Sequence, residues 1–156
     1  MKRMLAMMMV IGLLCAVAAA LAEEGPLPWD TPIIVDDGYG ENLTLKLACV
    51  EDDATAEGVE KAVGRWVRVE LSATGRTIDM GEIQELCDFS MMSMQTPQHL
   101  TLTARQDGDD IEYLISLWFD KPKNIDVDSM TVDIFNWGKA WSTVELSLAG
   151  APGPEQ

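Results

Sequence analysis

Histidine is nearly absent from this sequence, and with it the usual machinery of hydrolytic catalysis. The 156 residues hold a single histidine, His99. A Ser-His-Asp or Cys-His arrangement needs an imidazole as general base, and a zinc site needs several His or Cys ligands at short spacing. His99 follows Pro97 at the start of a predicted strand, in the phase opposite Leu100, which is typical of a surface side chain. We therefore expect no catalytic residues and no enzyme; a hydrolase of unfamiliar type is the alternative.

Basic side chains are also scarce. Lys and Arg number 11 against 26 Asp and Glu, which gives a formal net charge of −15. A field of this sign repels the phosphates of nucleic acids and anionic lipids. We therefore expect no nucleic-acid partner, whereas cations and basic or neutral partners fit the charge.

A long uncharged and largely apolar run occurs at the N-terminus, from Met4 to Ala20. Lys2 and Arg3 precede it, and Ala20-Leu21-Ala22 follows it as a small-x-small cleavage site. A retained transmembrane anchor is the alternative, because the run approaches the ~20 residues that cross a bilayer. The pattern predicts a cleaved signal peptide over residues 1–22, a secreted or extracytoplasmic location and no membrane span after cleavage. Without the two leader cations the formal net charge falls from −15 to −17.

Only two cysteines follow this leader, Cys49 and Cys87. An even number of cysteines in an exported protein predicts a disulfide between them.

Proline and glycine gather at the two ends of the remaining chain. Residues 23–32 contain three prolines, which block helix and ladder formation and indicate an extended lead-in. Residues 149–156 (AGAPGPEQ) indicate a disordered tail. The folded domain is therefore expected over residues 33–148.

Between these ends the apolar residues alternate with polar ones at a period of two, as in strands with one buried face. Asp107-Gly108 and Asn136–Lys139 are hairpin signals, and one turn of helix is expected within Asp79–Cys87. About seven or eight strands predict an all-β, immunoglobulin-like antiparallel sandwich, with a small barrel as the alternative. The alternating runs are Leu43–Cys49, Val67–Leu71, Leu100–Ala104, Ile111–Phe119, Met130–Ile134 and Val144–Leu148.

Four stretches resemble the immunoglobulin-like (telokin-like) domains of unknown function found in bacterial secreted proteins and lipoproteins. They are Gly64–Leu71, Phe89-Ser90-Met91, Ile115–Pro122 and Met130-Thr131-Val132. The resemblance implies an immunoglobulin-like sandwich, and the family brings no catalytic residues with it.

Acidic residues crowd one predicted turn, at Asp107, Asp109, Asp110 and Glu112. Oxygen-rich turns suit a hard cation, so calcium is the one cofactor considered. The turn does not match the D-x-[DN]-x-[DN]-G loop of known calcium sites, and an ordinary polar turn is the competing interpretation. Further acidic clusters lie at Asp36-Asp37, at Glu51–Asp53 and at Asp126/Asp128.

The tryptophans are the candidate ligand-binding residues. Trp66, Trp118 and Trp141 fall in the phase opposite the aliphatic faces of their strands, and Trp137 lies at a predicted hairpin tip. Outward rings can stack on sugars or on a partner's apolar surface, but tryptophans also pack across strands and are usually well buried. The sequence thus predicts a non-catalytic binding or interaction module for an unknown protein or glycan. A carbohydrate-binding module that uses these rings, with or without calcium, is the alternative.

Overall fold

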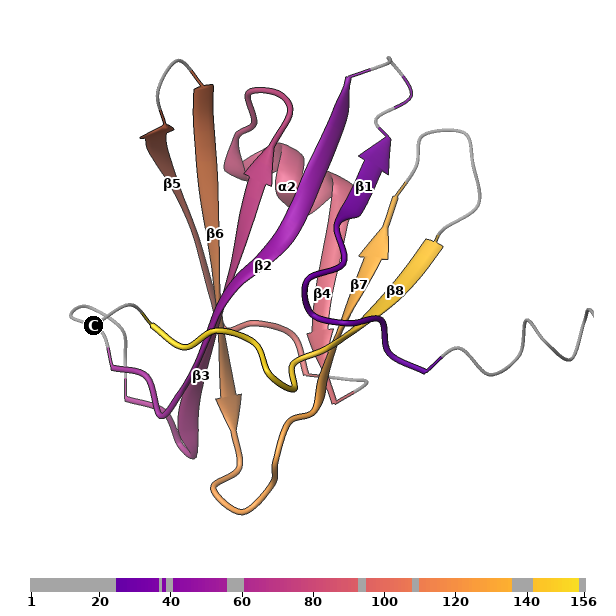
Figure 1. The fold of residues 1–156 in the computed structure, drawn as a ribbon. Helices are drawn as coiled ribbons and strands as arrows, with labels where there is room; N and C mark the ends of the chain where they lie inside the picture. The colour runs from indigo at the N-terminus through magenta and orange to yellow at the C-terminus, as the bar shows by residue number, and fades with distance from the viewer. Residues whose placement is uncertain are drawn as a thin grey trace, which may run out of the picture.

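Eight strands and one short helix make up the described part of the computed structural model (Figure 1). The structure describes residues 25–36, 38, 41–55, 61–92, 95–107, 110–135 and 142–154. The elements are β1 Ile33–Asp36, β2 Asn42–Asp52, β3 Arg65–Thr74, α2 Met80–Leu86, β4 Cys87–Met91, β5 His99–Asp107, β6 Asp110–Lys121, β7 Ser129–Ile134 and β8 Ser142–Ser147. The predicted leader, residues 1–22, lies outside the described residues.

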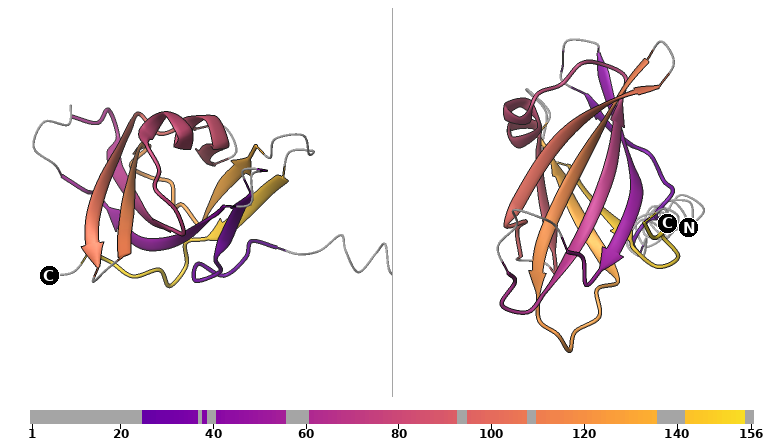
Figure 2. Two further views of the ribbon diagram at one scale, coloured as in Figure 1. Left: turned by 90° about the horizontal axis from the view of Figure 1, so that it is seen from above. Right: turned by 90° about the vertical axis from the view of Figure 1, so that its left-hand side faces the viewer.

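The strands form two antiparallel sheets that pack face to face (Figures 1 and 2). The larger sheet has the order β1-β2-β3-β6-β5 and the smaller one the order β4-β7-β8. Strands β2 to β8 thereby follow the strand order of the constant-type immunoglobulin sandwich, and β1 adds an edge to the larger sheet. The predicted all-β sandwich is confirmed, and the sheets do not close into the alternative barrel.

Apolar alternation places the core between the two sheets. Val67, Val69 and Leu71 of β3 are buried, as are Met130 and Val132 of β7. Strand β6 contributes the longest inward row, from Tyr113 to Phe119, as its period of two predicts. Among the described residues, no helix is long and apolar enough to cross a membrane.

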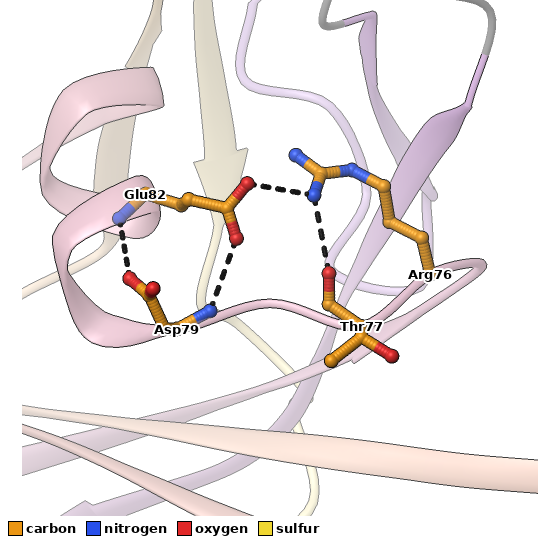
Figure 3. A network of polar contacts seen from close by, with 4 residues as sticks. All are labelled: Arg76, Thr77, Asp79 and Glu82. Atoms are coloured by element: carbon orange, nitrogen blue, oxygen red, sulfur yellow. Dashed lines mark hydrogen bonds and ion pairs between the residues drawn. The ribbon is translucent and has the colours of Figure 1, made fainter.

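Helix α2 carries the chain from the large sheet to the small one, and its start is fixed by a capping box (Figure 3). The Asp79 carboxylate accepts from the Glu82 N–H at 3.0 Å, while the Glu82 carboxylate accepts from the Asp79 N–H at 3.2 Å. Arg76 donates to the same Glu82 carboxylate at 2.9 Å. These bonds satisfy donors that a helix N-terminus leaves open, and they place Ile83 and Leu86 in the core.

A bulge in β2 places Cys49 on the face of the sheet opposite to the one that the sequence predicts. Leu47 pairs with Leu71, but Cys49 pairs with Glu70, so the register shifts by one residue between them. Beyond the bulge the inward position passes to Val50, which pairs with Val69. The sequence predicts one buried face from Leu43 to Cys49; the bulge instead turns Cys49 to the outer face of the sheet.

The predicted disulfide is absent from the structure for this reason. Cys49 and Cys87 are both buried and both free. Cys87 lies in the core between the sheets, opposite Ile134 of β7. Cys49 points away from that core, so the large sheet itself separates the two sulfur atoms and a bond would require a different register of β2.

Both ends of the described chain pack against the sandwich. Leu27 of the predicted lead-in bonds to β8 despite its flanking prolines: its N–H donates to the Glu145 carbonyl at 2.8 Å and its carbonyl accepts from Ser147 at 2.7 Å. The tail, expected to be disordered, is ordered over residues 149–154 because the Pro152 carbonyl accepts from the Val50 N–H at 2.9 Å. This contact joins the C-terminal segment to β2.

Candidate functional site

Trp66 and Trp118 lie on the outer face of the large sheet, but they are buried there. Their rings meet edge to face at 6.4 Å between centroids, and only 9% and 5% of the two residues is exposed. Ala54 packs on them from the segment after β2, held by a hydrogen bond from its N–H to the Trp66 carbonyl. His99 adds an edge contact to Trp66 at 5.5 Å. The pair forms a second small core and offers little ring surface to a ligand.

Four polar side chains of this outer face are joined to one another. Arg68 makes ion pairs with Glu51 at 2.9 Å and with Glu70 at 3.1 Å, and it lies over the Trp118 ring at 5.6 Å. Ser116 donates to the Glu70 carboxylate at 3.2 Å. These contacts serve the packing of the sheet, and they leave Arg68 no free charge for a partner.

The other predicted site residues are the two remaining tryptophans and the acidic residues near the β5–β6 turn. Trp137, Trp141 and Asp109 lie outside the described residues. Asp107 and Asp110 are paired at the end of the β5–β6 hairpin, where their side chains are not described, and Glu112 pairs with Arg105 across the strands. Within the described ranges, no three His, Cys, Asp or Glu side chains gather as ligands for a metal ion.

A buried lysine lies in a pocket lined by residues near the ends of β2 and β6 and the start of β3. Figure 1 shows the course of these three strands. Lys121 continues the inward row of β6 after Phe119 and is only 2% exposed. We call this site the Lys121 pocket. Its lining residues are Val50, Asp52, Val67, Lys121, Asp126, Val127 and Leu148, and its volume is about 110 Å³.

The backbone around Lys121 is held in place by its neighbour Asp120. One carboxylate oxygen of Asp120 accepts from the Gly64 N–H at 2.8 Å, and the other accepts from the Val63 N–H at 2.8 Å. The Gln95 side chain donates to the Asp120 carbonyl. Asp120, the residue before the end of β6, is thereby tied to the segment just before β3 and to the segment after β4, which holds the backbone on the N-terminal side of Lys121.

The ammonium of Lys121 is partly removed from water and has no direct counter-ion among the described residues. In the part of the chain that the structure describes, no hydrogen bond or ion pair reaches it. Burial lowers the pKa of Lys121, and the Arg65 guanidinium lowers it further; the carboxylates of Asp52, Asp126 and Asp128 act in the opposite direction. An ammonium in this state has three donors to offer to a ligand.

Arg65 is partly neutralised at the edge of the pocket. It pairs with Asp52 at 3.0 Å and reaches the Ile125 carbonyl at 3.4 Å. Asp52 therefore lines the pocket while engaged by Arg65, and its side chain remains 53% exposed. Asp52 and Asp126, which belong to two acidic clusters noted in the sequence, thus lie near two cations of the protein itself, Arg65 and Lys121.

The alternating run predicted from the sequence ends at Phe119 and does not include Lys121. The signal was available in the alternation, because Lys121 stands two residues after Phe119 in the same inward phase. A lysine in an apolar phase at the end of a long strand is a rare position, since charged side chains are seldom fully buried without a partner.

The two thiols are not candidates for nucleophilic chemistry. Burial, with a smaller contribution from the nearby Asp88 carboxylate, raises the pKa of Cys87 to about 12. Burial and then Glu70 raise the pKa of Cys49, although Arg68 acts against them. Both sulfurs are thus held as neutral thiols at neutral pH, whereas the thiolate is the reactive form.

Comparison of the chain with protein-family models, with curated proteins and with solved structures finds no match.

Proposed function

We propose that this chain is a non-catalytic binding module, exported from the cytoplasm, whose ligand enters the Lys121 pocket. The observation that carries the proposal is the burial of the Lys121 side chain, whose ammonium forms no hydrogen bond or ion pair with the described residues. Removing an ammonium from water costs several kcal/mol unless it is paired. Pockets that combine apolar walls with a few convergent polar groups are the common form of a ligand site.

The tryptophans support this choice of site by their burial. Trp66 and Trp118 would have to be uncovered before a sugar ring could stack on them, because Ala54 and the second ring already occupy their faces. The Lys121 pocket needs no such rearrangement, since it is already open to solvent at one side. A glycan remains one kind of ligand to be tested there.

Thermal unfolding of the purified chain tests the proposal. A ligand that binds only the native state raises the melting temperature by mass action. We would measure melting with cell-wall and dietary glycans, calcium, chelator, small carboxylates and short peptides. The wild-type chain is compared with Lys121→Met, which keeps the side-chain length, and with Lys123→Met, which removes an exposed charge nearby.

The expected result is at least one compound that raises melting of the wild-type chain and of Lys123→Met but not of Lys121→Met. An equal shift in all three proteins would place the ligand elsewhere. A panel without any shift would reject the proposal.

A further inference from the structure

We propose, on the basis of the proposed function, that the Lys121 pocket binds a free carboxylate carried by a residue with a small apolar side chain. The pocket sets three conditions on an occupant: its charge, its size and the polarity of its two ends. Each condition follows from the residues that line it.

The first condition is charge. The Lys121 ammonium needs an acceptor, and a carboxylate gives short, charge-assisted hydrogen bonds. Asp52 and Asp126 also line the pocket, and Asp128 lies near enough to act on Lys121. This local negative charge disfavours a multiply charged anion such as phosphate. A single carboxylate suits the Lys121 ammonium, which pairs with none of the described residues.

The second condition is size. A volume of about 110 Å³ is smaller than the ~150 Å³ cavity that holds one benzene molecule. The part of an occupant that enters the pocket should therefore be smaller than a sugar ring or an aromatic side chain, although the rest of a ligand can extend into solvent. A carboxylate with one to three further carbon atoms fits it.

The third condition is the division of the lining into apolar walls and an acidic rim. Val50, Val67, Val127 and Leu148 offer only methyl groups. Asp52 and Asp126 are exposed and lie toward solvent. The occupant should thus place an alkyl group against the walls and a hydrogen-bond donor at the rim. An alanine-like residue has all three parts.

Two sources supply this chemistry. In the C-terminal residue of a peptide, the donor at the rim is an amide N–H. In a free amino acid it is an ammonium group, which the rim carboxylates attract more strongly. Titration calorimetry with N-acetylalanine and with alanine separates these sources by which one binds more tightly.

Three further probes in the titration each differ from N-acetylalanine in one property that the pocket requires. N-acetylalaninamide lacks the carboxylate, N-acetylphenylalanine is too large, and inorganic phosphate carries excess charge. We expect each to bind at least tenfold more weakly than N-acetylalanine or alanine. Lys121→Met should weaken the better ligand at least tenfold, Lys121→Gln should be intermediate because it keeps a donor, and Lys123→Met should bind like the wild type. Circular dichroism checks that the variants are folded.

Equal binding of the amide and the acid, or unchanged affinity in a folded Lys121→Met chain, would overturn the inference. If neither alanine compound binds while another compound of the melting panel acts through Lys121, the inference fails and the proposed function stands. If no compound acts through Lys121, both fail.

Discussion

Gly64 lies directly against the backbone of Lys121. A Cβ atom at this position would overlap the Lys121 carbonyl oxygen, and it would also come within 3.1 Å of the Asp120 carboxylate. The obstruction is mainly backbone, which cannot move aside as a flexible side chain can. The start of β3 thus approaches the end of β6 as closely as glycine allows.

Gly64→Ala should therefore destabilise the chain by about 2–3 kcal/mol, the cost of forcing extra volume into a packed site. Urea unfolding measures the change. Gly153→Ala is the matched control, because no atom lies within 4 Å of its added methyl group. A loss below about 0.5 kcal/mol for Gly64→Ala, the range of ordinary surface changes, would show that the two strands can separate here.

Lys121→Met should raise the free energy of unfolding by about 1 kcal/mol at neutral pH, since it removes a buried charge and keeps the side-chain volume. The sign of the pH dependence follows from the lowered pKa. As the pH approaches 10.5, the ordinary pKa of lysine, the folded chain binds fewer protons at Lys121 than the unfolded chain does. The free energy of unfolding of the wild type therefore rises relative to that of the variant as the pH increases. Urea unfolding of both proteins from pH 7 to 10.5 should show the gap closing. A variant less stable than the wild type would mean that Lys121 is paired and structural.

The free thiols give a prediction that distinguishes this register of β2 from a disulfide-bonded one. Iodoacetamide added in urea without reductant should modify both Cys49 and Cys87, whereas the native chain should resist modification because both are buried. Mass spectrometry counts the adducts. Failure to modify either residue in urea, restored by reductant, would show a disulfide and a different β2 register.

Cys87 should make the chain sensitive to alkali. Its pKa rises from 9.0 in the unfolded chain to about 12 in the folded one, so the folded state holds the proton more tightly between these values. The contribution of Cys87 to the free energy of unfolding is fully present below pH 9. It falls by about 1.4 kcal/mol per pH unit above pH 9. Relative to Cys87→Ala, the wild type should lose stability along this slope in urea unfolding at pH 9–10.5. A constant difference between the two proteins would contradict the assigned burial.

Much of the fold could be predicted from the alternation of apolar residues, because β3 and β7 each bury one face and β6 does so from Tyr113 onward, although Ile111 at its start is exposed. The β2 bulge could not, since Leu47, Ala48 and Cys49 are all apolar enough for either face. The alternation predicted that Trp66 and Trp118 lie on the outer face of the sheet. It could not predict their burial, because Ala54, which packs on them, belongs to a different segment of the chain.

The Lys121 pocket depends on contacts between parts of the chain that are far apart. Leu148 from the C-terminal segment and Val127 from the β6–β7 connection complete its walls. No local pattern specifies that these segments meet over the end of β6. The sequence shows only the unusual phase of Lys121, and the three-dimensional packing turns that phase into a pocket.

Methyl-resolved NMR of the purified chain tests most directly whether the Lys121 pocket is the binding site. With saturating N-acetylalanine or alanine, or the panel compound that raises melting, we expect shift changes at the methyl groups of Val50, Val67, Val127 and Leu148. Val132, buried in the core, and Ile34, exposed on β1, should keep their positions. This pattern would place the ligand beside Lys121. A ligand that stabilises the chain without moving the pocket methyls, or that moves only distant ones, would contradict the assignment.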